Sequence, residues 1–195
     1  MRLTKTELRA QQGRLTQLRR YLPTLQLKKA MLQFEVLGAI AEIDKIREEL
    51  SNARQKVEAF RPFLDERVEC DLSESAEIIL VKKHYENIAG VEIPVFEKVL
   101  FRDPTYSLFD TPVWTDQSAA LVRAMIVERE RLRIAEEKRR ALEKELRDVS
   151  IRVNLFEKVL IPRSEQNIQK IKVFLGDQQL AAVAQAKVAK RKMRA

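Results

Sequence analysis

Glycine and proline are scarce in this chain. Of its 195 residues, 4 are glycine and 6 are proline, whereas glycine makes up about 7% of an average protein. Folds with many strands need glycine in their turns, and nucleotide-binding folds need it in phosphate-binding loops. Gly13, Gly38, Gly90 and Gly176 lie far apart, so neither glycine-rich nucleotide motif occurs. The shortage argues against a many-stranded fold and against a glycine-rich nucleotide-binding enzyme.

Long apolar runs, cysteine and histidine are also rare. The longest uncharged run is nine residues, 178–186, while a membrane-spanning helix needs about 20 apolar residues. The N-terminus lacks the apolar stretch of a signal peptide. Cys70 cannot form a disulfide within the chain, and His84 alone cannot build a histidine metal cluster. We expect a soluble protein of a reducing compartment, with no cofactor, no metal and no catalytic site.

A seven-residue repeat of apolar side chains runs through the first third. Fifteen of the seventeen a and d positions from Leu8 to Leu64 are apolar, the exceptions being Gln11 and Lys29. Charged residues fill most of the flanking positions, and 34% of the whole chain is charged. A repeat held over eight heptads predicts a left-handed coiled coil.

The last third carries a second repeat. Ten of thirteen a and d positions from Ser118 to Leu160 are apolar, and the stripe resumes in a shifted register at Ile168, Ile171 and Leu175. The two repeats have similar lengths, so they can pair within one chain at high effective concentration. We predict a mostly α fold, a long antiparallel two-helix coiled-coil hairpin; a parallel homodimer is the alternative.

These patterns divide one elongated domain into four segments. We predict an N-terminal coiled-coil helix over 1–64, a middle region over 65–117, a C-terminal coiled-coil helix over 118–180 and a basic tail over 181–195. The second helix can end near Gly176, because glycine often terminates helices.

Two prolines fall inside the predicted helices. Pro23 and Pro162 each remove a backbone donor and clash with the carbonyl four residues earlier. We predict a bend in the helix at each of them.

The middle region is predicted to contain a short β-hairpin. Residues 77–86 and 91–97 are rich in β-branched side chains, and Asn87-Ile88-Ala89-Gly90 lies between them. Gly90 suits the turn of a hairpin. Pro94 places the second strand at a sheet edge.

Charge is distributed unevenly along the chain. The net charge is +8 overall, +7 over residues 1–29, +5 over 187–195 and −7 over 65–117. A hairpin would therefore have a basic open end and an acidic closed end. Two basic ends lying together would repel each other, so we expect them to face an acidic surface of protein, nucleic acid or lipid.

Four segments of the sequence resemble one known family, and they are spread over nearly the whole chain. They are Leu3-Thr4-Lys5-Thr6-Glu7-Leu8 with Leu25-x-Leu27-Lys28-Lys29-x-x-Leu32; Asn87-Ile88-Ala89-Gly90-Val91-Glu92-Ile93-Pro94; Arg152-Val153-Asn154-Leu155-Phe156-Glu157 followed by Ile161-Pro162-Arg163; and Lys190-Arg191-Lys192-Met193-Arg194. On these residues the chain resembles the D subunit of the V-type and A-type rotary ATPases (ATP synthases), the central rotor stalk.

The resemblance implies a non-catalytic axle that transmits torque, at the cytoplasmic face of a membrane. The terminal end would contact the hexamer of catalytic and regulatory subunits, and the middle would bind the small F subunit of the rotor and the ring-capping subunit (C or d). The hexamer contacts implied are Lys5, Lys28, Lys29, Arg163, Lys187, Lys190, Arg191, Lys192 and Arg194. The contacts implied for the middle hairpin are Asn87, Ile88, Gly90, Val91 and Pro94.

Other classes of protein fit less well. A prefoldin-like coiled-coil chaperone would expose apolar residues at its open tip, and this tip is basic. The γ subunit of F-type ATPases has a larger α/β domain between its arms. A nucleic-acid-binding coiled coil fits the pI of about 9.7, but not the acidic middle region, and no base-reading motif occurs.

Overall fold

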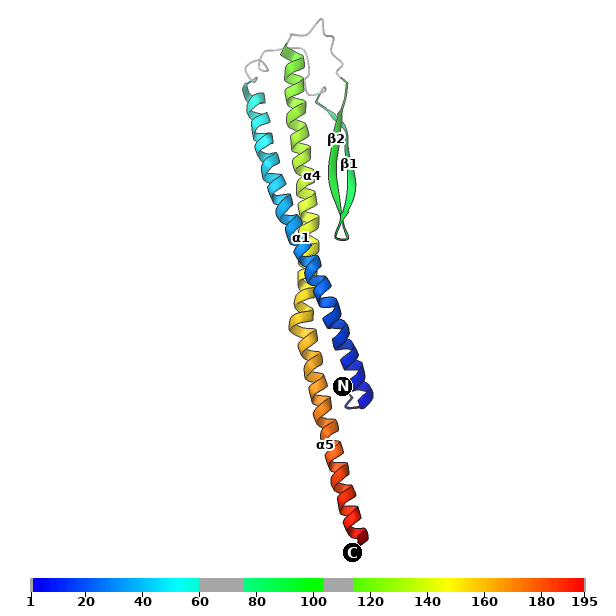
Figure 1. The fold of residues 1–195 in the computed structure, drawn as a ribbon. Coiled ribbons are helices and arrows are strands. Elements are labelled where there is room, and N and C mark those ends of the chain that lie inside the picture. Colours follow the sequence, from blue (N-terminus) through cyan, green and yellow to red (C-terminus); the bar gives the residue numbers. More distant parts are fainter. Residues whose placement is uncertain (1, 60–75, 104–113, 195) are drawn as a thin grey trace. The chain divides into compact units, whose positions relative to one another are not determined.

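The structure is a computed structural model that describes residues 2–59, 76–103 and 114–194. Its elements are shown in Figure 1: helix α1 (Lys5–Ala59), strands β1 (Ile78–Ile88) and β2 (Val91–Phe101), helix α4 (Trp114–Leu155), a π-helical turn η1 (Phe156–Leu160) and helix α5 (Ile161–Arg194). The predicted fold class is confirmed: the chain is mostly helical, and one antiparallel two-stranded sheet lies between the two long helical segments in the sequence. The predicted boundary at 64/65 lies outside the described residues.

The chain forms two compact units. One comprises residues 1–30 and 147–195, and the other comprises residues 31–146. In each unit, part of α1 packs against the second helical segment.

The first unit pairs the start of α1 with α5 in antiparallel fashion. Arg19 Nη2 lies 2.6 Å from Glu165 Oε1, and Gln26 donates a hydrogen bond to Glu157. Residue numbers therefore increase along α1 as they decrease along the second helical segment, so the two run antiparallel. Ile168 and Ile171 are buried in this pairing.

The second unit pairs the rest of α1 with α4, again antiparallel. Lys138 Nζ donates to Glu42 Oε2 at 2.8 Å, and Arg131 Nη1 donates to Glu49 Oε2 at 3.0 Å. Between these ion pairs, Ile46 belongs to a buried apolar cluster. Every buried residue of α1 is an a or d residue of the predicted repeat: Leu18, Leu32, Val36, Ala39, Ile43 and Ile46.

Helix α4 buries a second face that the heptad pattern does not include. Ile126 and Ile134 are buried, and Glu130 between them is only 7% exposed. The guanidinium of Arg133 lies 2.8 Å from the Glu130 carboxylate, and this partner offsets the cost of burying the charge. Ile134 lines a small cavity with Phe96 of β2, so this second face carries the hairpin.

The π-helical turn ends at Leu160, two residues before Pro162. Ile161 N–H bonds to the carbonyl of Phe156, five residues earlier. A π turn holds one more residue than an α turn, so it rotates the following helix relative to the stripe. This extra residue explains the shifted register that the sequence shows beyond Pro162.

Both prolines lie within helices. Helix α1 continues through Pro23 without interruption, and Pro162 is the second residue of α5. The bends expected at these positions stay predictions. The expectation of a helix end near Gly176 is wrong: α5 continues to Arg194. The predicted tail is therefore part of this helix, because residues 177–194 contain neither proline nor glycine.

Candidate partner-binding surfaces

The end of α5 in the first unit is exposed on all sides. Ile171 is the last buried residue of this helix, and the described side chains from Asp177 to Met193 are all exposed. Among the described residues, none packs on this stretch. Helices in proteins are stabilised mostly by packing against a neighbour. This exposed stretch is therefore suited to binding a partner.

Residues spaced by three and four give this helix end one patterned face. Leu180 and Val183 come first, and they are 71% and 54% exposed. Lys187, Lys190 and Arg191 continue the same face at the i, i+3 and i+4 spacing. Lys192 lies on another face and is also exposed, and Arg194 is the last residue of the helix. The patterned face is therefore apolar near Leu180 and basic toward the C-terminus.

The other basic residues predicted at the hexamer end are distributed along the first unit. Lys5 is the exposed first residue of α1, whereas Lys28 and Lys29 are half-buried. Since Lys5 and Lys28 are 23 residues apart on one helix, about 35 Å separates them. Arg163 lies near the start of α1, in a polar groove of about 330 Å³ that Arg14 also lines. The structure does not gather the predicted basic residues into one cluster.

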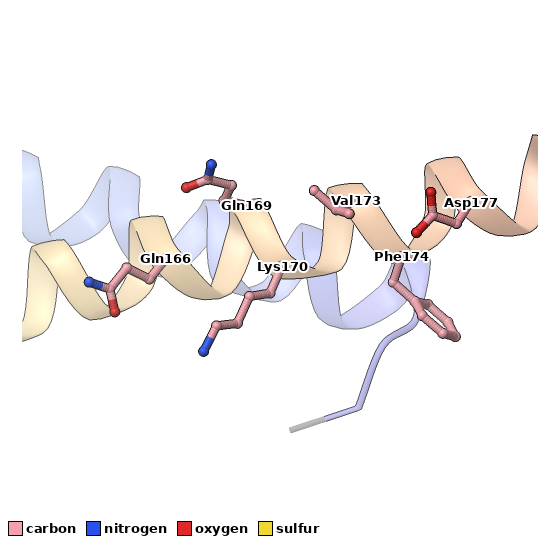
Figure 2. Close-up of a pocket in the computed structure, with 6 residues that line it drawn as sticks. All are labelled: Gln166, Gln169, Lys170, Val173, Phe174 and Asp177. Carbon is pink, nitrogen blue, oxygen red and sulfur yellow. The ribbon is translucent and has the colours of Figure 1, made fainter.

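A wider groove follows the side of α5, and its volume is about 520 Å³. Figure 2 shows Lys170 and Phe174 projecting from one side of the helix and Gln169 and Val173 from the other. All its described lining residues come from α5: Gln166, Gln169, Lys170, Val173, Phe174 and Asp177. A site lined by a single helix holds a small ligand poorly, because such sites are normally concave and enclosed. Half-exposed Val173 and Phe174 instead suit contact with a protein.

In the second unit, the turn of the hairpin has the geometry that the sequence predicts. Ala89 and Gly90 have positive φ values of 52° and 82°, as a two-residue type I′ turn requires. The Gly90 N–H donates a 3.0 Å hydrogen bond to Oδ1 of Asn87. Ile88 and Val91 are paired on either side of the turn.

Pro94 lies in the contact between the hairpin and the helices. Ile93 and Pro94 are both buried, and Pro94, Val95 and Phe96 line a cavity of about 40 Å³ with residues of α1 and α4. Of the five predicted hairpin contacts, Pro94 thus contributes to packing within this unit. Asn87 and Gly90 are exposed, and Ile88 and Val91 are partly exposed.

Polar contacts fix the hairpin to α4. Lys83 Nζ lies 3.2 Å from Glu137 Oε1 and 5.4 Å from the ring centre of Tyr85. The hydrogen bond to Tyr85 and then the one to Glu137 raise the pKa of Lys83. Near the other end of the hairpin, Arg123 Nη2 donates a 2.8 Å hydrogen bond to the backbone carbonyl of Arg102. The hairpin therefore has a defined position on α4.

Arg131 bonds to acidic residues on both helices of the second unit. Nη1 donates to Glu128 Oε2 at 2.8 Å as well as to Glu49. Burial acts to lower the pKa of Arg131, but the hydrogen bond and charge of Glu128, with Glu49, outweigh it, so the pKa is raised. The guanidinium stays charged and links the two helices.

Neither a metal cluster nor a membrane span is found in the described part of the chain. No group of three or more His, Cys, Asp or Glu side chains there could hold a metal ion. No helix among residues 2–59 and 114–194 is long and apolar enough to cross a membrane.

Comparison with known proteins identifies the family. Residues 7–191 match the family described as the D subunit of ATP synthase. The chain belongs to this family. The V-type ATP synthase D subunit of Chlamydia caviae is 43% identical over 194 residues, which cover 99% of this chain and 93% of that protein.

Two further V-type ATP synthase D subunits are similar over the same length. That of Chlamydia trachomatis serovar L2 is 42% identical, with 99% of this chain and 96% of the relative covered. That of Chlamydia pneumoniae is 39% identical, with 99% and 93% covered. As a member of the D-subunit family, the chain is a coiled-coil subunit of a rotary ATPase of the V type, associated with ATP synthesis and ion transport.

The face of α4 that binds the hairpin is not part of the heptad pattern. Ile126, Glu130 and Ile134 are spaced by four, and they lie one or two positions away from the predicted stripe. Because this face has only Ile126 and Ile134 on either side of the charged Glu130, its apolar periodicity is too weak to predict a buried face from the sequence. The alternation of β-branched residues in the hairpin was the available hint, because a lone hairpin needs a surface to pack on.

Proposed function

We propose that this subunit is the central rotor axle of the complex. It transmits torque between the catalytic ATP-binding hexamer and the ion-translocating ring in the membrane, and it catalyses no reaction itself. The observation that carries the proposal is the antiparallel helix pairing, with an apolar seam, within each unit.

Helix pairing suits a part that must carry load. A single helix bends easily, whereas two helices joined by an apolar seam resist bending and twisting together. Each buried seam residue, such as Leu32, Ile43 or Leu142, contributes about 1.5–3 kcal/mol to the pairing. Ion pairs between the helices, such as Lys138 with Glu42, fix the register of one helix against the other.

An axle must also be asymmetric. The hexamer has chemically identical catalytic sites, so a rotor can set them to different states only by contacting each of them differently. The π turn and Pro162 make one helix of the pair locally unlike its partner. We assign the eccentric contact to this region and to Pro23.

The exposed end of α5 is the proposed contact with the hexamer. Its apolar residues and then its basic residues follow one helix face, and they fit a sleeve that is apolar at its mouth and acidic deeper in. Lys5, Lys28, Lys29 and Arg163 add positive charge along the first unit.

The hairpin unit is the proposed contact with the other rotor parts. Asn87, Ile88, Gly90 and Val91 form the tip of the hairpin, whose turn is closed by the hydrogen bond from Gly90 N–H to Asn87, and Lys83 of the same strand pairs with Glu137 of α4. We assign to this unit the binding of the small F subunit of the rotor and of the ring-capping subunit, at the cytoplasmic face of the membrane. Replacing residues 77–97 by a Gly/Ser loop should lower the affinity for the F subunit, measured by calorimetry; unchanged affinity would contradict this assignment.

Cross-linking tests the axle itself. A Lys190→Cys, Cys70→Ser variant is incorporated into the complex and joined by a disulfide to a cysteine placed in a hexamer subunit. If the rotor turns, the disulfide stops ATP-driven ion transport and steady-state ATP hydrolysis, and reduction restores both. The Cys70→Ser protein alone is the control. Continued coupled transport with the cross-link intact would exclude an axle.

A further inference from the structure

Strand β1 has an edge on which no other strand of the described residues lies. Within the described residues the sheet has two strands. β2 packs on the helices through Pro94 and Phe96, whereas β1 reaches α4 through the long side chain of Lys83. β1 is therefore the outer strand. It exposes Ile79, Leu80 and Tyr85 by 64%, 48% and 59%. A free edge with exposed apolar side chains is a template for pairing with another strand.

The register determines which backbone groups lie on that edge. Ile88 and Val91 flank a two-residue turn and are paired, so they form a hydrogen-bonded pair, and such pairs alternate along the ladder. The backbone N–H and C=O groups of His84 and Glu86 therefore bond to β2. Those of Lys83, Tyr85 and Asn87 point to the free edge.

Pro94 supports this assignment. It is paired with Tyr85, and a proline interrupts a ladder unless its nitrogen points away from the neighbouring strand. The Tyr85–Pro94 pair is thus a non-hydrogen-bonded pair. The alternation of pairs, starting from the hydrogen-bonded Ile88–Val91 pair at the turn, gives the same result. The backbone groups of Tyr85 consequently face outward.

The outward edge is self-complementary around His84. If a second β1 lies antiparallel with His84 opposite His84, Lys82 lies opposite Glu86, Lys83 opposite Tyr85, and Leu80 opposite Ile88. In this register, outward-pointing residues meet outward-pointing residues, so their N–H and C=O groups can bond. Opposite charges also meet at two symmetry-related positions, as an isologous contact requires.

We propose that the unassembled chain forms a homodimer through β1, in which the two hairpins make a four-stranded antiparallel sheet centred on His84. The proposal goes beyond the axle function, because it concerns the free protein before it enters the complex. A sheet of four strands is more stable than a lone hairpin, and the pairing covers Leu80 and Tyr85.

Sedimentation velocity of the full chain between about 1 and 100 µM, a range that spans micromolar affinities, tests the proposal. We expect a monomer–dimer equilibrium. Tyr85→Pro should abolish the dimer, since it removes an outward N–H and leaves the bonds to β2 intact, as Pro94 does on the opposite strand. A monomer at every concentration would overturn the proposal, including the case in which this edge serves a strand of another protein.

Charge reversal tests the register. Glu86→Lys places lysine opposite Lys82 at two positions and should weaken the dimer by roughly tenfold. The double variant Lys82→Glu, Glu86→Lys restores the opposite charges and should restore the affinity. A Glu86→Lys protein that dimerises like the parent would exclude this register.

Disulfide formation provides an independent check in a Cys70→Ser background. His84→Cys should form a disulfide-linked dimer readily, since the two cysteines would face each other in a non-hydrogen-bonded pair. Lys82→Cys is the matched control: its counterpart would lie four residues away along the strand, about 13 Å. Cross-linking at Lys82 but not at His84 would overturn the proposal.

Discussion

The four glycines occupy two kinds of backbone position. Gly13, Gly38 and Gly176 lie within helices, and an added Cβ would meet nothing within 4 Å. Gly90 has a φ of 82° in the hairpin turn, where a side chain is strained. Only Gly90 is required by the conformation of the backbone.

Replacing Gly38 by alanine should therefore stabilise the protein. Glycine in a helix interior costs about 0.8–1.0 kcal/mol relative to alanine, and Gly38 is exposed. We expect the free energy of unfolding in urea to rise by about that amount. Gly90→Ala is the matched control and should lower it by about 1–2 kcal/mol. A stability loss for Gly38→Ala would show that the helix needs glycine there.

Lys83 should stabilise the hairpin in a manner that depends on pH. Its pKa is raised in the folded protein by Tyr85 and Glu137, so its contribution is complete below the unfolded-state pKa of about 10.4. The contribution is lost as the pH rises through the folded-state pKa. The difference in unfolding free energy between the parent and Lys83→Met should be constant from about pH 7 to 9 and diminish above about pH 10. A difference that grows at high pH would contradict the assigned contact.

At the scale of elements, the π turn joins two helical stretches whose buried residues follow different heptad registers. Val149 and Val153 follow the heptad stripe, while Ser164, Ile168 and Ile171 are buried one position later than that stripe would place them. Without the extra residue in η1, the helix after Pro162 would turn its apolar side about 100° away from α1. The turn also lies where the ring of Pro162 would otherwise clash with a carbonyl.

Deleting Val159 together with Pro162→Ala should therefore be tolerated. The deletion removes the extra residue and the substitution removes the clash, so a regular α-helix with the same buried residues results. We expect a thermal midpoint within a few degrees of that of Pro162→Ala alone. Deletion of exposed Lys144 is the control: it rotates Val149 and Val153 out of the seam, and each buried valine contributes about 1.5–3 kcal/mol. Equal losses for both deletions would contradict the role of η1.

At the scale of the whole molecule, positive charge is concentrated at the end of α5, where the described side chains from Asp177 to Met193 are all exposed. Residues 187–195 hold five basic residues and no acid. Attraction to an acidic surface acts over a Debye length of about 10 Å at 0.1 M salt. The proposed hexamer contact should therefore have a salt-dependent part from the basic residues and a salt-independent part from Leu180 and Val183.

Removing residues 187–195 should weaken assembly with the hexamer most strongly at low salt. We expect at least a roughly tenfold loss of affinity at about 50 mM salt and a smaller loss at about 500 mM, because screening already removes the attraction in the parent protein. Leu180→Ala, Val183→Ala is the control, and its loss should be similar at both salt concentrations. A truncation whose effect is absent at both would exclude the basic end as a contact.

Much of the candidate site could be predicted from the sequence. The seam of α1, the turn at Gly90 and the positive charge of residues 187–194 follow from short-range patterns, whereas the helical conformation of residues 187–194 was not predicted. The placement of Pro94 inside the packing, and of Lys28 and Lys29 at half-buried positions, could not be predicted in the same way. These depend on which neighbour a residue meets.

The sequence alone determined the coiled coil and the hairpin, because heptad spacing, strand alternation and turn residues act between residues close in the chain. The tertiary structure alone decided how the π turn restores the seam and which face of α4 carries the hairpin. It also decided that β2 is the inner strand and β1 the open one. The physical reason is that burial is a property of two surfaces together: a stripe becomes a seam, or an edge becomes free, only when its neighbour is in place.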